Sequence, residues 1–196
     1  MKDKSTRDYI VEAADQLFYR QGYQHTSFTD IADAVKISRG NFYHHFKTKD
    51  DILAAVIDYR QQGTQAMLAQ WTAASETPQA RIHAFICMLT TNRTQIMQSG
   101  CPVGTLCAEL AKLGHPAQDQ ANALFSLFRG WLREQFHALG RHVDADDLAM
   151  HALMRSQGIA TLAHAFKDEL FVEREVTQFF DWLARCLAEP PDKATP

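Results

Sequence analysis

The sequence predicts an all-α protein in two parts, a small N-terminal helix-turn-helix domain and a larger C-terminal helical domain. Apolar residues recur at helical spacing along almost the whole chain of 196 residues. No alternation typical of a β-strand is sustained beyond a few residues. Glycine and proline are sparse and cluster at a few points where a helix must end. The segments between these breaks predict about nine helices.

Three short helices are expected in the first part of the chain. The first, over about 6–21, has apolar residues at the spacing of one helix face and is followed by a glycine. The second, over 27–35, starts with the serine and aspartate of a capping box. The third, over 39–45, follows a serine that can act as its N-cap.

The breaks divide the rest of the chain into six longer segments. Helices are expected over about 48–74, 78–98, 103–113, 117–139, 144–167 and 173–187. We therefore expect a helix-turn-helix domain over residues 1–50, a helical domain over 51–189, and a disordered tail over 190–196.

Composition excludes several classes of protein. Hydrophobic residues make up 46% of the chain and charged residues 22%, as in globular proteins with a sizeable core. No apolar run approaches the ~18–20 residues of a membrane span, and no signal peptide is recognisable. We therefore expect a cytoplasmic protein without membrane contact. The four cysteines fit no zinc-binding spacing and should be thiols, so neither a metal nor a cofactor is expected.

The net charge of -3 excludes binding of nucleic acid by bulk positive charge, although it allows a local basic patch. Residues 1–50 hold eight Lys or Arg and seven Asp or Glu, a net of +1, which leaves -4 for the remainder. No acid lies between residues 34 and 49. The basic residues of that stretch are Lys36, Arg39, Lys47 and Lys49. On charge alone, a solvated face is the more typical explanation of such a stretch.

Residues 26–46 have the layout of a helix-turn-helix. Two short helices are joined by a turn at about 35–37, and their apolar residues can form one small core. The side of the second helix left free of core residues carries Arg39, Asn41, Tyr43 and His44. Arginine can pair with guanine and asparagine with adenine, while tyrosine and histidine suit phosphate oxygens. A small helical hairpin with an aromatic core is the alternative.

An ordered series of short elements extends this pattern in both directions. The elements are Ala13-Ala14 to Phe18, Arg20-Gln21-Gly22-Tyr23, Thr26 to Ala32, Ser38-Arg39-Gly40, Phe42 to Phe46, then Lys49 and Leu53. With them, residues 9–53 closely resemble the DNA-binding domain of TetR/AcrR family transcriptional regulators. The resemblance implies three helices with the third in the major groove. It also implies a variable helical domain that binds a ligand and dimerises through its last two long helices.

The resemblance assigns DNA-binding roles by position. Residues implied to face bases are Arg39, Gly40 and Asn41. Residues implied to contact phosphates are Ser27, Thr29, Tyr43, His44 and Lys49. The chain departs from the family at Lys36, where a glycine is usual. A lysine with positive φ costs about 1 kcal/mol, so we expect either a different turn or a compensating contact between Lys36 and the DNA backbone.

The middle helices carry many bulky apolar residues, which suit an adaptable ligand pocket. The residues expected in this pocket are Met67, Trp71, Phe85, Met88, Leu89, Asn92, Cys101, Glu109, Phe125, Phe128 and Trp131. Ordinary core packing is the alternative for each apolar member, and a structural or exposed role for each polar one.

The last helix has apolar residues on more than one face, so one face is expected to need a partner. A helix-turn-helix protein that binds a palindrome also needs two copies one DNA turn apart. Both arguments predict a homodimer, with internal packing of both faces as the alternative. The expected interface residues are Met154, Leu162, Phe166, Phe179 and Leu183.

These inferences predict a repressor that binds double-stranded operator DNA as a homodimer and is released by a small-molecule effector.

An alternative with the same fold is a redox or electrophile sensor that uses Cys101, because the break at 100–104 resembles a block in one subset of these regulators. A thiol just before a helix N-terminus can also be activated. A remote alternative is an interaction protein or enzyme with a relic helix-turn-helix. No enzymatic motif is present, so an enzyme is not expected.

Overall fold

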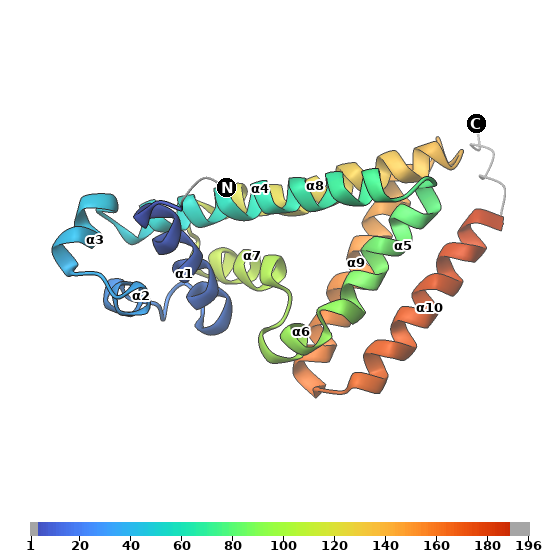
Figure 1. Cartoon of the computed structure of the whole chain (residues 1–196). Helices are drawn as coiled ribbons and strands as arrows, with labels where there is room; N and C mark the ends of the chain where they lie inside the picture. Colours follow the sequence, from blue (N-terminus) through green and yellow to red (C-terminus); the bar gives the residue numbers. More distant parts are fainter. Residues whose placement is uncertain (1–3, 189–196) are drawn as a thin grey trace. The chain divides into compact units, whose positions relative to one another are not determined.

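The computed structural model describes residues 4–188, which form ten α-helices and no β-strand (Figure 1). The helices are α1 (Thr6–Gln21), α2 (Phe28–Val35), α3 (Arg39–His45), α4 (Lys49–Ala74), α5 (Pro78–Thr91), α6 (Arg93–Ser99), α7 (Pro102–Leu113), α8 (Gln118–Ala138), α9 (Ala145–Phe166) and α10 (Glu169–Ala188). The all-α prediction is confirmed. The tail expected at 190–196 lies outside the described residues.

Two helix boundaries differ from the sequence prediction. The single helix expected over 78–98 is divided into α5 and α6 at Asn92, whose side-chain amide donates to the Met88 carbonyl at 3.1 Å. Helix α10 begins at Glu169, earlier than the expected residue 173. The carboxylate of Asp168 accepts the Phe171 N–H at 3.1 Å and so caps the added turn.

The contacts divide the chain into two compact units. The first comprises the chain up to Gly63 together with residues 102–124, and the second comprises residues 64–101 and the chain from Phe125 onward. Helices α4 and α8 therefore each begin in the first unit and end in the second. The first unit is larger than the helix-turn-helix domain expected over 1–50, because α7 packs against α1.

Helices α1 and α4 of the first unit begin with the same reciprocal pair of hydrogen bonds as α2. A serine or threonine hydroxyl accepts the N–H three residues on, and the aspartate there accepts the N–H of the serine or threonine. The pairs are Ser5 with Asp8, Ser27 with Asp30, and Thr48 with Asp51. The backbone N–H that each aspartate accepts stabilises its anion and lowers its pKa.

The core of the first unit is small and apolar. Phe18 of α1, Ile31 of α2 and Phe42 of α3 are buried together with Leu53 of α4. The Phe42 ring meets the Phe28 ring edge to face, with 5.2 Å between the centroids. These contacts fix the short α3 against α2.

The second unit is built mainly from α5, α9 and α10, which pack along one another, while α6 packs against α9 (Figure 1). Its fully buried side chains include Phe85, Phe136 and Phe179. The indole N–H of Trp131 donates to the Thr72 hydroxyl at 2.9 Å, which satisfies the polar atom of a buried ring. None of the described helices has both the length and the apolarity that a membrane span requires.

Lys36 ends α2 in the left-handed conformation, with φ 58° and ψ 43°. Its N–H bonds the Asp33 carbonyl at 3.2 Å, and the N–H of Ile37 bonds the Ala32 carbonyl at 3.2 Å. The turn thus has a backbone conformation that suits glycine, although a lysine occupies it. Of the two outcomes expected at this position, a different turn is wrong, because Lys36 itself adopts the left-handed conformation; a compensating contact between Lys36 and the DNA backbone stays a prediction.

We expect Lys36→Gly to raise the free energy of unfolding by about 0.5–1 kcal/mol, because glycine adopts positive φ without a Cβ clash. Urea unfolding of the purified chain measures this difference. Lys36→Ala is the control, since it removes the same side chain but keeps the Cβ. An equal gain for both variants would show that the lysine side chain, and not the backbone, is the source of the strain.

Candidate nucleic-acid interface

The structure brings most of the expected DNA-binding residues to the surface of α2, α3 and the turn between them. Eight of the nine are exposed, and only Lys49 is half-buried. The exposed residues are Ser27, Thr29, Lys36, Arg39, Gly40, Asn41, Tyr43 and His44. No acidic residue lies in α3, so the part of this surface that α3 forms is polar and basic.

Helix α3 presents its polar side chains because Phe42 is buried. Phe42 is 1% exposed, which turns the opposite side of the helix outward. A Cβ added to Gly40 would meet nothing within 4 Å, so the backbone is open to close approach there. Arg39 Nη2 lies 3.5 Å from the Thr29 hydroxyl and so links α3 to the first turn of α2.

Ser27 has a structural role at its position on this surface. Its hydroxyl donates to Asp30 Oδ2 at 2.8 Å and accepts the Asp30 N–H at 3.2 Å. The capping bonds orient the Ser27 hydroxyl toward the N-terminus of α2. The structure shows that Ser27 caps α2. The implied contact between Ser27 and a phosphate stays a prediction.

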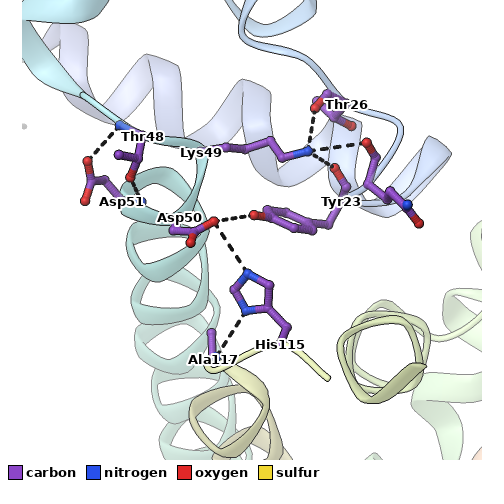
Figure 2. Close-up of polar contacts among 9 residues, drawn as sticks. Tyr23, Thr26, Thr48, Lys49, Asp50, Asp51, His115 and Ala117 are labelled. Atoms are coloured by element: carbon purple, nitrogen blue, oxygen red, sulfur yellow. Dashed lines mark hydrogen bonds and ion pairs between the residues drawn. The ribbon is translucent and has the colours of Figure 1, made fainter. Parts of the chain in front are cut away.

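Lys49 is placed differently from the prediction. Figure 2 shows its ammonium group directed at Tyr23 and Thr26, in the turn between α1 and α2. Nζ donates to the carbonyl oxygens of Tyr23, Gln24 and Thr26 at 3.0, 3.3 and 3.2 Å. It also lies 4.3 Å from the centroid of the Tyr23 ring. All three N–H donors of the ammonium are used within the chain, which corrects the expected phosphate contact.

The same region holds a polar network that sequence reasoning missed (Figure 2). The Tyr23 hydroxyl donates to Asp50 Oδ1, and Nε2 of His115 lies 3.5 Å from the same oxygen. The hydrogen bond from Tyr23 lowers the pKa of Asp50, while burial and the same carboxylate raise the pKa of Tyr23. Nδ1 of His115 accepts the Ala117 N–H at 3.1 Å just before α8 begins.

Lys47 is a further residue that the prediction omitted. Its ammonium donates to the Tyr43 carbonyl at 2.5 Å and so caps the last turn of α3. A lysine four residues after a carbonyl at a helix end is a recognisable C-terminal signal. The spacing in the sequence could therefore have identified this contact.

The aromatic residues expected in a ligand pocket gather in the second unit. The rings of Trp71 and Trp131 lie 5.7 Å apart, and those of Phe85 and Phe128 lie 5.9 Å apart. Leu89 is buried with them, at 2% exposure. Met67, Met88 and Phe125 are half-buried. The placement accords with core packing, and the pocket stays a prediction.

The polar residues assigned to that pocket have other roles. The carboxylate of Glu109 accepts two N–H groups of the turn between α1 and α2, each at 2.9 Å. Because both bonds lie in the first unit, Glu109 is occupied there, and its expected pocket role is wrong. Asn92 is exposed at the boundary between α5 and α6.

The four cysteines are free thiols. Cys101 is half-buried, and its Sγ accepts a bond from Gln157 Nε2 at 3.5 Å. Cys107 is buried on α7. Among residues 4–188, no three His, Cys, Asp or Glu side chains gather in a geometry that could hold a metal ion.

The expected dimer residues separate into two groups. Met154, Leu162 and Phe166 of α9 are 60%, 43% and 73% exposed. Phe179 and Leu183 of α10 are fully buried within the chain itself. Their expected contact with a partner is therefore wrong, because the face of α10 that carries them packs inside the second unit.

The chain is similar in sequence to known bacterial transcriptional regulators. Residues 10–56 match the family model described as bacterial regulatory proteins, tetR family. The chain is 31% identical over 169 residues to the HTH-type transcriptional regulator in the lacX 3′ region of Lactococcus lactis subsp. lactis, a match that spans 84% of this chain and 86% of the relative. It is 25% identical over 129 residues to the HTH-type transcriptional repressor DhaR of Mycobacterium sp. strain GP1, over 65% of this chain and 62% of the relative.

A solved structure shares the fold over almost the whole chain. The crystal structure of a TetR transcriptional regulator from Legionella pneumophila superposes with a TM-score of 0.81 at 26% sequence identity. The superposition covers 93% of this chain and 99% of that one. The similarity therefore extends over both units.

We expect Lys49→Ala to lower the free energy of unfolding by about 1–3 kcal/mol, because three backbone carbonyls lose their charged donor. Lys112→Ala, at an exposed position of α7, is the matched control and should change stability by less than about 0.5 kcal/mol. Thermal and urea unfolding of both variants test this. A Lys49→Ala variant as stable as the control would return Lys49 to the list of candidate phosphate contacts.

Proposed function

Because the chain belongs to the TetR family of bacterial transcriptional regulators, we propose that it is a repressor that binds operator DNA as a homodimer and is released by a small-molecule effector. The observation that carries the DNA-binding part is the exposed face of α3. Arg39, Asn41 and Tyr43 lie on it without an opposing carboxylate. Repression is supported by the similarity to DhaR, which is itself a transcriptional repressor.

The α3 side chains suit both parts of DNA recognition. Arg39 can donate two hydrogen bonds to guanine, and the amide of Asn41 can pair with adenine. The open backbone at Gly40, between them, lets the helix approach the base edges closely. Tyr43 and His44 can donate to phosphate oxygens, which fix the register of the helix in the groove.

The dimer surface that we propose is a stripe along α9. Met150, Met154, Leu162 and Phe166 are all exposed, and they repeat at intervals of four or eight residues. Between Met154 and Leu162, the four-residue repeat falls on Gly158, which has no side chain. A Cβ added to Gly158 would meet nothing within 4 Å. Large side chains at such spacing lie along one ridge of a helix, and here Gly158 leaves a gap in that ridge. The ridge exposes more apolar surface than isolated residues do, so a partner helix is its natural cover.

The effector site that we propose lies among the aromatic residues of the second unit. The tryptophan pair and the phenylalanine pair supply the apolar lining typical of such sites. An effector releases DNA if it binds more tightly to the form of the dimer that does not fit the operator.

Selection of bound DNA from a random pool tests the proposal directly. A palindromic consensus with half-sites one helical turn apart is the expected result. Repeating the selection with candidate effectors tests release in the same experiment. Recovery of random sequences by the intact chain at moderate salt would overturn the proposed function.

We expect Arg39→Ala to weaken binding to the selected operator by about 1–3 kcal/mol and to relax preference at one base position. Arg20→Ala, at an exposed position of α1, removes the same charge and is the control. Titration against operators that differ at single base pairs measures both effects. Equal weakening on every sequence would make Arg39 a phosphate contact.

We expect Gly158→Leu to prevent dimerisation while the chain stays folded. The open space around Gly158 accommodates the side chain in one copy, and leucine favours a helix more than glycine does. On a packed dimer surface, the same side chain would separate the two helices. Gly63→Leu, at an exposed glycine of α4, is the control and should remain dimeric. Sedimentation of both variants decides, and a dimer as tight as the wild type would refute the α9 surface.

A further inference from the structure

The turn between α1 and α2 has its backbone held from two sides by side chains of opposite charge. On one side, Glu109 of α7 accepts the Tyr23 N–H with Oε2 and the Gln24 N–H with Oε1, each at 2.9 Å. On the other side, the ammonium of Lys49 donates to carbonyl oxygens of the same turn (Figure 2). N–H groups and carbonyls of one short segment are thus bound by complementary charges.

Gly22 makes the contact with Glu109 possible. Its φ is +90°, a conformation that L side chains rarely adopt, and it places the next two N–H groups toward α7. A Cβ at this position would lie 3.0 Å from Glu109 Oε1 and 3.2 Å from Oε2. The glycine is therefore required both by the backbone conformation and by the close approach of the carboxylate.

The turn leads directly into the helix-turn-helix. Thr26 is 1% exposed, and its hydroxyl donates to the Gly22 carbonyl at 2.7 Å, which closes the turn. Ser27, the next residue, is the N-cap of α2. The Tyr23 ring is buried between Phe18 and His115, at centroid distances of 5.3 and 5.2 Å. A shift of the turn would therefore move the start of α2 and, through their shared core, α3.

We propose that Glu109 is a positioning residue for operator recognition, which holds the turn between α1 and α2 so that α7 and the DNA-contacting helices keep one relative orientation. The proposal rests on the proposed DNA-binding function and adds to it a residue outside the helix-turn-helix. Glu109 lies 86 residues from Tyr23 in the sequence. It touches no base or phosphate in this role and acts only through the backbone of the turn.

The sign of the effect separates positioning from plain electrostatics. Removing a carboxylate from a DNA-binding unit makes its charge more positive, which favours binding to any DNA. Loss of a positioning contact weakens binding to the specific operator instead, because the recognition helix no longer keeps the orientation that fits the groove. The two explanations therefore predict changes of opposite direction for the same variant.

The test compares Glu109→Ala and Glu109→Gln with Asp119→Asn in the full-length chain. Asp119 is exposed in the first turn of α8, and its variant makes the same change of charge as Glu109→Gln. Three quantities are measured: affinity for the selected operator, affinity for unrelated duplex DNA, and hydrogen exchange of the Tyr23 and Gln24 amides. Thermal unfolding identifies any variant that does not fold.

We expect Glu109→Ala to bind the operator about 10-fold more weakly, with faster exchange of both amides and an unchanged dependence of the affinity on salt. Glu109→Gln retains one carbonyl oxygen and should lose less affinity than Glu109→Ala. Asp119→Asn should bind the operator at least as well as the wild type and leave both amides protected.

Two results would overturn the proposal. Operator affinity of the Glu109 variants equal to or above that of the wild type would show that Glu109 does not position the helices. Unchanged exchange of the Tyr23 and Gln24 amides would show that the bonds do not hold the turn. A wild-type chain that selects no operator would overturn the proposed function itself, and the exchange measurement would still report on the turn.

Discussion

The burial of Phe42 is the constraint on which the DNA-binding surface depends. Helix α3 has seven residues, well below the ~12–15 at which an isolated helix is even marginally stable in water. It therefore exists only because Phe42 is fixed in the core beside Phe28, while Ser38 caps one end and Lys47 the other. The burial of Phe42 determines which side of α3 faces solvent. Truncating Phe42 would therefore disorient Arg39 and Asn41 together.

Local chemistry made much of this predictable from sequence. The serine and aspartate spacing that begins α2 is a signal within four residues, and the structure forms the expected reciprocal bonds. The strain at Lys36 is likewise local, because the turn after α2 requires positive φ whatever residue occupies it. The exposed face of α3 follows from helical periodicity once Phe42 is assigned to the core.

Long-range partners were not predictable, for a physical reason. A lysine ammonium suits a backbone carbonyl as well as a phosphate, so the sequence could not show that Lys49 turns toward Tyr23. Glu109 was assigned to a pocket because its true partners are backbone N–H groups, which carry no sequence signature. On α10, apolar residues occur on several faces, and only the packing shows that Phe179 is internal while α9 carries the exposed stripe.

The placement of the carboxylates explains how a chain of net charge -3 can present a basic surface. Helices α1, α2 and α4 each begin with an aspartate that accepts N–H groups at its own N-terminus. These carboxylates neutralise the positive ends of their helix dipoles. Helix α3 differs, because Asn41 stands where the other three have aspartate, and no acid lies in its first turn. Of the four helices, α3 is thus the one whose N-terminus an approaching anion meets without opposition, next to Arg39. A serine or threonine cap therefore stabilises all four helices, and in α3 it does so without an acidic residue in the first turn.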